Sequence, residues 1–177
     1  MDASIEQWTA LAVLLPPAQA EDVVGFRMIG EQEAGVETLV EGLLEHGVPA
    51  ADNVRAEIAV LAEVWGVRGR VEDALRRARP DPAGGTCVRL APPVAAVDRQ
   101  TPPVVVPWLE CATCGGVLNR VVDGPFISDV DADRLELIDP DGTWGYEADE
   151  LWEAFATLHE CCDDPDCRLA PWLAWED

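Results

Sequence analysis

The chain has 177 residues, of which 34 are acidic and 12 are basic, and its formal net charge at pH 7 is −22. Hydrophobic residues make up 49% of it, which is enough for a packed core and too many for a wholly disordered chain. A surface this acidic repels nucleic-acid backbones and anionic membranes, so it favours basic proteins or cations as partners.

The N-terminal segment is predicted to be helical. Ser4-Ile5-Glu6-Gln7 matches a capping box that begins a helix over residues 4–15, and a second helix is expected near 18–29. The apolar run before Pro16 is too short for a signal peptide and lacks its basic flank. No apolar run reaches the roughly 20 residues of a membrane span. We therefore expect a cytoplasmic protein without a membrane partner, whose thiols are reduced or metal-bound. The alternative is a secreted protein with disulfides, given the even count of six cysteines.

Two further helices are predicted from apolar residues at the spacing of a buried helix face. The first stripe ends at Gly47, and the second follows the N-cap candidate Asp52 and ends at Gly66. The two stripes consist of Val36, Leu39, Val40, Leu43 and Leu44, and of Val54, Ile58, Leu61, Ala62 and Trp65. With a last helix near 70–79, residues 1–79 are predicted to form a helical bundle.

The composition changes after this helical part. Residues 80–107 hold seven of the 14 prolines. Because proline fixes φ and lacks an N–H donor, we expect a stiff linker with no helix and no central strand. A cysteine-containing unit follows over 108–177. The sequence indicates strands at 104–106, 117–122 and 134–138, a turn at 139–142 and a helix at 148–160. The predicted fold class is therefore α+β: an N-terminal helical bundle followed by a small zinc-ribbon-like mixed α/β unit.

Glutamates lie four residues apart on the helix that ends at Gly47, on a face away from its apolar stripe. They are Glu33, Glu37, Glu41 and Glu45, with Glu31 just before them. Like charges at this spacing repel each other, and no arginine lies between residues 28 and 54 to offset them. One interpretation is a solvated face. The other is a surface that meets a basic partner.

The same helix carries a short motif of a known family. The segments Gly30-Glu31 and Gly35-Val36-Glu37-Thr38-Leu39, followed by Leu43, resemble the G-E-x-x-x-[AG]-[LV]-E-x-L-x-x-x-L signature of MafI-type immunity proteins. The likeness continues through Val48-Pro49 and the helix from Asn53 to Trp65, and it covers roughly residues 5–78.

This resemblance implies a small helical protein, without chemistry of its own, that binds a cognate polymorphic toxin and occludes its active site. The toxin of such a protein is often a nuclease, whose basic phosphate-binding surface attracts an acidic inhibitor. The candidate partner-binding residues are then Glu31, Glu33, Glu37, Glu41 and Glu45.

The cysteines suggest a second kind of site. Cys111-Ala112-Thr113-Cys114-Gly115-Gly116 has the spacing of a zinc knuckle, in which glycines permit the tight turn. The favoured interpretation is one structural zinc ion held by Cys111, Cys114, Cys162 and Cys167. Cys161 or His159 is an alternative ligand. Buried reduced cysteines and disulfides are the other interpretations, and Cys87 has no evident role.

Other motifs carry less information about function. The segment 129–133 begins like a calcium loop but lacks the glycine and the bidentate glutamate of one. Five arginines are clustered and are expected to act within the protein, by docking on the acidic second unit or by charge complementarity at a helix C-terminus: Arg68, Arg70, Arg76, Arg77 and Arg79. With two histidines, acid–base catalysis has few candidates, and we expect no enzyme. The alternative to an immunity protein is a zinc-binding adaptor or regulatory protein whose C-terminal unit is the functional part.

Overall fold

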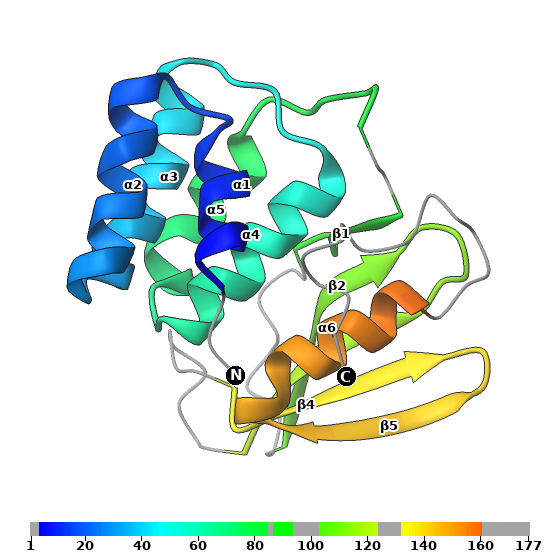
Figure 1. Ribbon diagram of the computed structural model, residues 1–177. Helices are drawn as coiled ribbons and strands as arrows, with labels where there is room; N and C mark the ends of the chain where they lie inside the picture. The colour runs from blue at the N-terminus through cyan, green and yellow to red at the C-terminus, as the bar shows by residue number, and fades with distance from the viewer. Residues whose placement is uncertain (1–3, 85–86, 94–102, 124–131, 161–177) are drawn as a thin grey trace. The chain divides into compact units, whose positions relative to one another are not determined.

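The computed structural model describes residues 4–84, 87–93, 103–123 and 132–160 (Figure 1). Its contacts divide them into a unit of residues 4–84 and a unit of residues 87–160, which we describe separately. The described residues form helices and one antiparallel sheet. The α+β class expected from the sequence is therefore confirmed.

The first unit consists of helices only. They are α1 (Ile5–Ala12), α2 (Pro17–Ile29), α3 (Gln32–Glu45), α4 (Asp52–Val64) and α5 (Arg68–Arg77). α3 packs against α2, α4 and α5, while α1 packs against α2. The core side chains include Trp8, Leu39, Leu43, Ile58, Leu61 and Leu75, each fully buried. The helices predicted from the apolar stripes are confirmed. Each stripe is removed from water by packing against another helix.

Glycines end the helices where the sequence places them. Gly47 and Gly66 have φ values of 57° and 64°, in the left-handed region that favours glycine. Beyond each one a backbone N–H reaches back into the last helical turn, with Val48 N–H donating to Leu43 at 3.0 Å and Val67 N–H to Ala62 at 2.8 Å. This is the Schellman arrangement, which satisfies carbonyl groups at a helix end.

Two helix starts differ from expectation. The N-cap of α4 is Ala51, and the predicted cap, Asp52, is instead the first helical residue and pairs with Arg55 one turn on. At α1, Ser4 Oγ accepts the Gln7 backbone N–H at 3.2 Å, as in a capping box. The Gln7 side chain, however, donates to Glu57 Oε1 of α4 at 2.8 Å. A contact with another helix has replaced the second half of the box.

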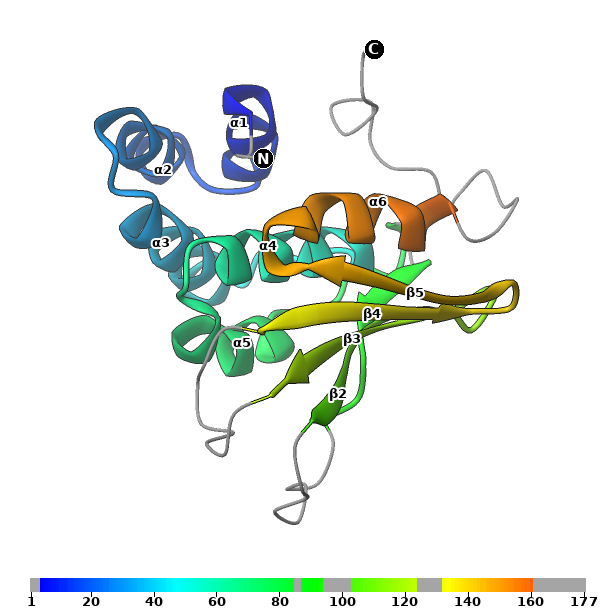
Figure 2. The same ribbon diagram turned by 90° about the horizontal axis from the view of Figure 1, so that it is seen from below.

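The second unit is an antiparallel sheet with one helix on it. The strands are β1 (Val88–Leu90), β2 (Val104–Cys111), β3 (Val117–Val122), β4 (Arg134–Asp139) and β5 (Gly142–Glu147), in the order β1-β2-β3-β4-β5. A 3-10 turn, η1 (Ala148–Glu150), leads into α6 (Leu151–Glu160). α6 lies across one face of the sheet (Figure 2) and contacts β2, β3, β4 and β5. Phe155 and Leu158 of α6 are buried with Leu135 and Leu137 of β4.

The proline-rich segment 80–107 is not only a linker. The strand predicted at 104–106 is confirmed as the start of β2, whereas β1 was not predicted and the expectation of no central strand is wrong. β1 lies inside it, and the first residues of β2 belong to it, although β2 is a central strand between β1 and β3. The register shifts between Pro107 and Leu109. A bulge tolerates a residue without an N–H donor, which is how proline enters a central strand.

Candidate functional site

The glutamates of α3 lie at the surface. Glu31, Glu33, Glu41 and Glu45 are exposed and Glu37 is half-buried, while Val36, Leu39, Val40 and Leu43 of the same helix are buried. The separation of acidic and apolar faces expected from the sequence is therefore present.

Arg70 of α5 provides a counter-charge that the sequence analysis missed. Its guanidinium donates to Glu33 Oε2 at 2.8 Å and lies 2.8 Å from Glu37 Oε1. The interpretation that the acidic stripe has no internal counter-charge is therefore wrong for Glu33 and Glu37. Arg70 lies far along the sequence from them, and α5 reaches them because it packs against α3.

The five carboxylates do not form one straight row. Four residues in an α-helix advance the side chain by about 40° around the axis. The stripe therefore winds from the side of α5, where Arg70 meets Glu33 and Glu37, to the side of α2, where Gln19 Nε2 donates to Glu45 Oε2 at 3.3 Å. Among the described residues, no arginine pairs with Glu31, Glu41 or Glu45.

Other clustered arginines act inside the first unit. Arg68 bridges Glu63 at 2.8 Å and Glu72 at 2.5 Å, and Arg76 lies 2.5 Å from Glu72. Burial by itself raises the pKa of Glu72, but the hydrogen bonds and charges of Arg76 and Arg68 outweigh it and hold that pKa below its ordinary value. Burial likewise lowers the pKa of Arg68, and Glu72 and Glu63 more than reverse this. Arg68, Arg70 and Arg76 therefore act within the protein, but through ion pairs with glutamates of the first unit. Docking of the cluster on the second unit stays a prediction.

The turn between β2 and β3 brings two cysteines together. Cys111 N–H donates to Gly116 at 2.7 Å, and Gly115 has a φ of 76°, so a tight turn carries Cys111 and Cys114. Gly116 N–H points at Cys114 Sγ at 3.3 Å. Amide donors aimed at sulfur stabilise a thiolate in a zinc knuckle. Neither Cys111 nor Cys114 is in a disulfide.

Cys87, for which the sequence indicated no role, lies beside this turn. Its carbonyl accepts the Ala112 N–H at 2.6 Å, and Thr113 Oγ1 lies 4.0 Å from its sulfur. The strand pairing of Val88 with Cys111 produces this proximity. Cys87 is itself disulfide-bonded, so the expectation of reduced or metal-bound thiols is wrong for this residue, and the disulfide interpretation is favoured there.

The proposed zinc ligands are brought together only in part. Cys162 and Cys167, and the alternative Cys161, lie outside the described residues. His159, the other alternative, is buried on α6 with its ring 4.7 Å from that of Phe155. Within residues 4–84, 87–93, 103–123 and 132–160, no three His, Cys, Asp or Glu side chains are grouped to hold a metal ion.

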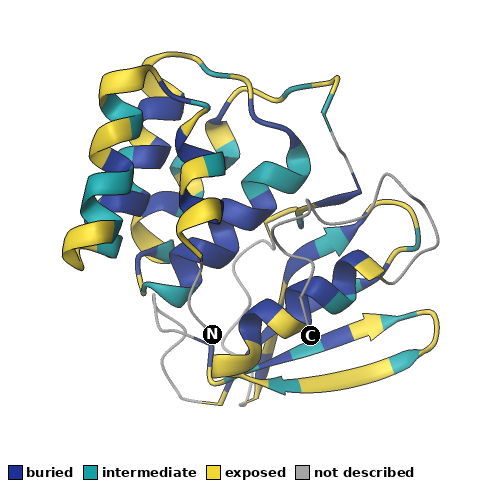
Figure 3. Cartoon of the chain, in the orientation of Figure 1, coloured by how far each residue is buried: buried dark blue, intermediate teal, exposed yellow. Residues whose placement is uncertain are grey.

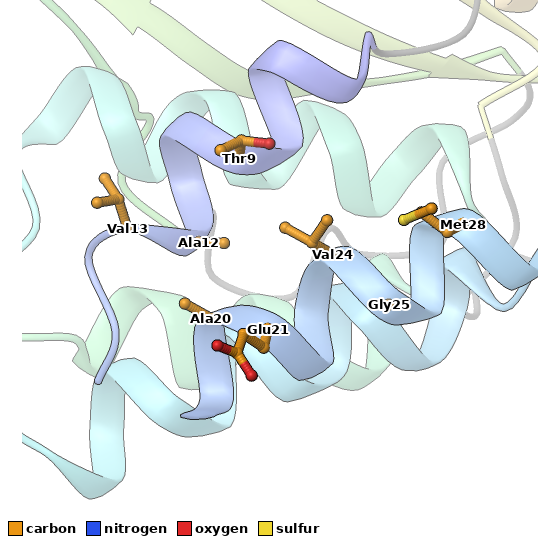
Figure 4. Close-up of a pocket in the computed structure, with 8 residues that line it drawn as sticks. All are labelled: Thr9, Ala12, Val13, Ala20, Glu21, Val24, Gly25 and Met28. Carbon is orange, nitrogen blue, oxygen red and sulfur yellow. The ribbon is translucent and has the colours of Figure 1, made fainter. Parts of the chain in front are cut away.

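An apolar groove between α1 and α2 had no signal in the sequence analysis. It has a volume of about 370 Å³ and is lined by Thr9, Ala12, Val13, Ala20, Glu21, Val24, Gly25 and Met28 (Figure 4). Val13 and Met28 are 73% and 75% exposed. The signal that could have located the groove is the pair of large apolar residues, Met28 and Ile29, just before the C-cap Gly30 of α2.

Part of the calcium-like segment is outside the description as well, since residues 129–131 are not described. Asp133 of this segment is described, and its Oδ2 accepts the backbone N–H of Asp123 at 2.6 Å. This carboxylate therefore links Asp133, the residue before β4, to Asp123, the residue after β3.

Within the described part of the chain, no helix combines the length and apolar character needed to cross a membrane. Comparison of the chain with family models, with curated proteins and with solved structures finds no match. A functional assignment therefore depends on the chain's own residues.

Proposed function

We propose that the chain is an acidic immunity protein. It binds a cognate basic protein toxin, such as a nuclease, and occludes the active-site surface of that toxin. The observation that carries this proposal is the row of carboxylates on α3, exposed along a helix whose opposite side is buried. A rigid, packed helix presents its charges in a fixed arrangement, which favours association with a surface of opposite charge.

The five glutamates of this face differ in whether an arginine of the chain pairs with them. Glu31, Glu41 and Glu45 have no arginine partner among the described residues. Arg70 fixes Glu33 and Glu37 in place while cancelling part of their charge. We therefore assign attraction of the partner mainly to Glu31, Glu41 and Glu45, and expect Glu33 and Glu37 to contribute less. Localisation in the cytoplasm and the absence of a nucleic-acid or membrane partner belong to this proposal.

The observation that favours a second candidate is the turn of Cys111 and Cys114, with its N–H donor directed at Cys114 Sγ. In this alternative, the second unit is a zinc-binding adaptor or regulatory module. Zinc is held by Cys111 and Cys114 together with Cys162 and Cys167. The first unit is then a scaffold, and its carboxylates are a solvated face.

The two candidates differ in what the neighbouring gene encodes and in which variants matter. An immunity protein requires a neighbouring gene for a toxin with a basic C-terminal domain, and the purified chain should bind that domain. A variant with Glu31→Gln, Glu41→Gln and Glu45→Gln should lose at least tenfold in affinity, about 1.4 kcal/mol. A matched control with Glu21→Gln, Asp22→Asn and Asp73→Asn removes equal charge from exposed positions on α2 and α5, and should change affinity little.

Either of two results would reject the immunity proposal. One is a gene neighbourhood without such a toxin. The other is equal affinity of the α3 variant, the control variant and the unmodified chain. If the Cys111→Ser, Cys114→Ser variant loses binding to the toxin domain and the α3 variant does not, the result would favour the adaptor.

A further inference from the structure

The last strand of the sheet, β5, is an open edge. Among the described residues β5 pairs only with β4, in a continuous register from Gly142 to Glu147. Most of its residues are exposed, as the colouring of Figure 3 shows. Natural edge strands are normally protected by proline, a bulge, lysine or very short length. β5 has six residues without proline, lysine or a bulge, and only its last N–H, that of Glu147, is covered, by the Glu150 carboxylate. β1, at the other edge, has only three residues.

The pairing pattern shows which backbone groups of β5 are directed outward. Asp139 and Gly142 flank a two-residue turn, and the pair that closes such a turn is hydrogen-bonded. Pairs alternate along an antiparallel ladder. Trp144 and Tyr146 therefore bond to β4, while Thr143, Gly145 and Glu147 direct their backbone groups away from the sheet. The Glu147 N–H already donates to Glu150 Oε2 at 2.9 Å, so the outward groups left for a partner are those of Thr143 and Gly145 and the Glu147 C=O.

The side chains of β5 add apolar area to this edge. Tyr146 lies on the face covered by α6, since its hydroxyl donates to Thr157 Oγ1 at 3.0 Å. Trp144 is two residues away, hence on the same face, and is 50% exposed. On the other face Ile138, which pairs with Thr143, is 45% exposed. Exposed apolar side chains beside unpaired backbone groups are typical of a strand-pairing surface.

We propose that β5 is a self-association edge, at which two copies of the chain pair antiparallel with Gly145 opposite Gly145 of the second copy. In this register the two Gly145 residues exchange both backbone hydrogen bonds, and the Thr143 N–H donates to the C=O of Glu147 of the second copy. Trp144 then faces Tyr146 of the second copy on the α6 side, and the two-fold axis repeats the contact. Cross-strand aromatic pairs stabilise antiparallel sheets, and glutamates do not oppose each other within the paired strands.

A second copy suits this edge better than a basic peptide does, because the pattern of outward groups and aromatic side chains is self-complementary. The same register places Asp141 opposite Asp149 of the second copy, just beyond the strands. Both are exposed carboxylates. Salt screens this repulsion, so the dimer should become tighter as ionic strength rises. Binding of a basic partner to α3 should weaken under the same change, which separates the two associations.

The test is sedimentation velocity of the full chain across micromolar concentrations, at low and high sodium chloride. The unmodified chain should form a dimer whose Kd falls with added salt. Trp144→Glu removes the aromatic pair, and Gly145→Pro removes an N–H that faces away from β4. Each should raise the Kd by at least about tenfold. Val105→Glu is the matched control, because it introduces the same acid at an apolar β2 position that is 43% exposed; it should dimerise like the unmodified chain.

A measurement on the unmodified chain makes the test independent of variant folding. Amide hydrogen exchange at Thr143 and Gly145 should slow as concentration rises, because dimerisation buries their N–H groups. Three results would overturn the proposal: a monomer at every concentration and salt, a dimer that Trp144→Glu and Gly145→Pro leave as tight as Val105→Glu does, or exchange at these amides that is independent of concentration.

Discussion

Gly35 of α3 lies directly against the indole of Trp8 in α1, so that a Cβ atom at position 35 would be 2.8 Å from a carbon of the ring. Both residues are buried. The packing of Trp8 explains why this position of α3 holds glycine. The space is filled by a rigid ring, which cannot move aside as a flexible side chain can.

Gly35→Ala should therefore destabilise the first unit. The added methyl group forces Trp8 or the helix to shift, which costs about 1 to 3 kcal/mol despite the better helix propensity of alanine. Urea denaturation followed by tryptophan fluorescence measures the change. Gly25→Ala in α2 is the control, because a Cβ there meets nothing within 4 Å. It should be neutral or stabilising by up to about 1 kcal/mol; equal effects at both positions would refute the packing argument.

Glu72→Gln should destabilise the first unit in a pH-dependent way. Glu72 lies between Arg68 and Arg76, with 18% of its side chain exposed. We expect a loss of about 1 to 3 kcal/mol at neutral pH. Glu33→Gln, which breaks an exposed pair with Arg70, should cost less than about 1 kcal/mol.

The pH dependence follows from the lowered pKa of Glu72. Above the pKa of the unfolded side chain, about 4.3, the carboxylate makes its full contribution to stability. This contribution is lost as pH falls through the lower pKa of the folded state. The difference in unfolding free energy between the unmodified chain and Glu72→Gln should thus be constant near neutrality and shrink in acid. A difference that grows in acid would contradict the assignment.

Arg70→Gln should strengthen binding to a basic partner if the α3 face binds it. The variant removes one positive charge from this face, and because the pairs of Arg70 are exposed it should change stability by less than about 1 kcal/mol. Affinity at low salt should rise severalfold, as measured by calorimetry. Arg89→Gln is the matched control, since Arg89 is similarly exposed and pairs with Glu110 in the second unit. Weaker binding by Arg70→Gln would mean that the partner uses this arginine.

Purified protein should contain about one zinc ion per chain if the knuckle-like turn binds metal. Metal analysis of Cys111→Ser, Cys114→Ser should show that the zinc is lost. Cys87→Ser should retain it, because Cys87 is already disulfide-bonded. Zinc-free protein in which Cys111 and Cys114 react with a thiol reagent only after unfolding would instead support buried reduced cysteines.

Local patterns were sufficient for the helices of the first unit and for β3 and β4. The apolar spacing and the glycines at positions 47 and 66 are properties of residues close together in the sequence. They determine these helices locally, without contacts from distant segments. β1 was missed because three residues beside prolines carry too little periodicity to be recognised. The cap at Asp52 was wrong because the aspartate pairs with Arg55 inside the helix.

The candidate site was less accessible to sequence reasoning, because its geometry depends on distant segments. Arg70 meets Glu33 and Glu37 across the packing of α5 on α3. Cys87 meets the turn at Ala112 through the pairing of β1 with β2. Neither contact has a signal in the residues around it, since tertiary packing alone determines it.

If the carboxylates of α3 attract a basic toxin, the affinity for that toxin depends on ionic strength. Titration of the neighbouring toxin domain into the chain at increasing ionic strength should give a steep loss of affinity. The Glu31→Gln, Glu41→Gln, Glu45→Gln variant should bind more weakly at low salt and show a shallower dependence. The Glu21→Gln, Asp22→Asn, Asp73→Asn control should retain the steep dependence. Identical salt dependence in all three proteins would contradict the account.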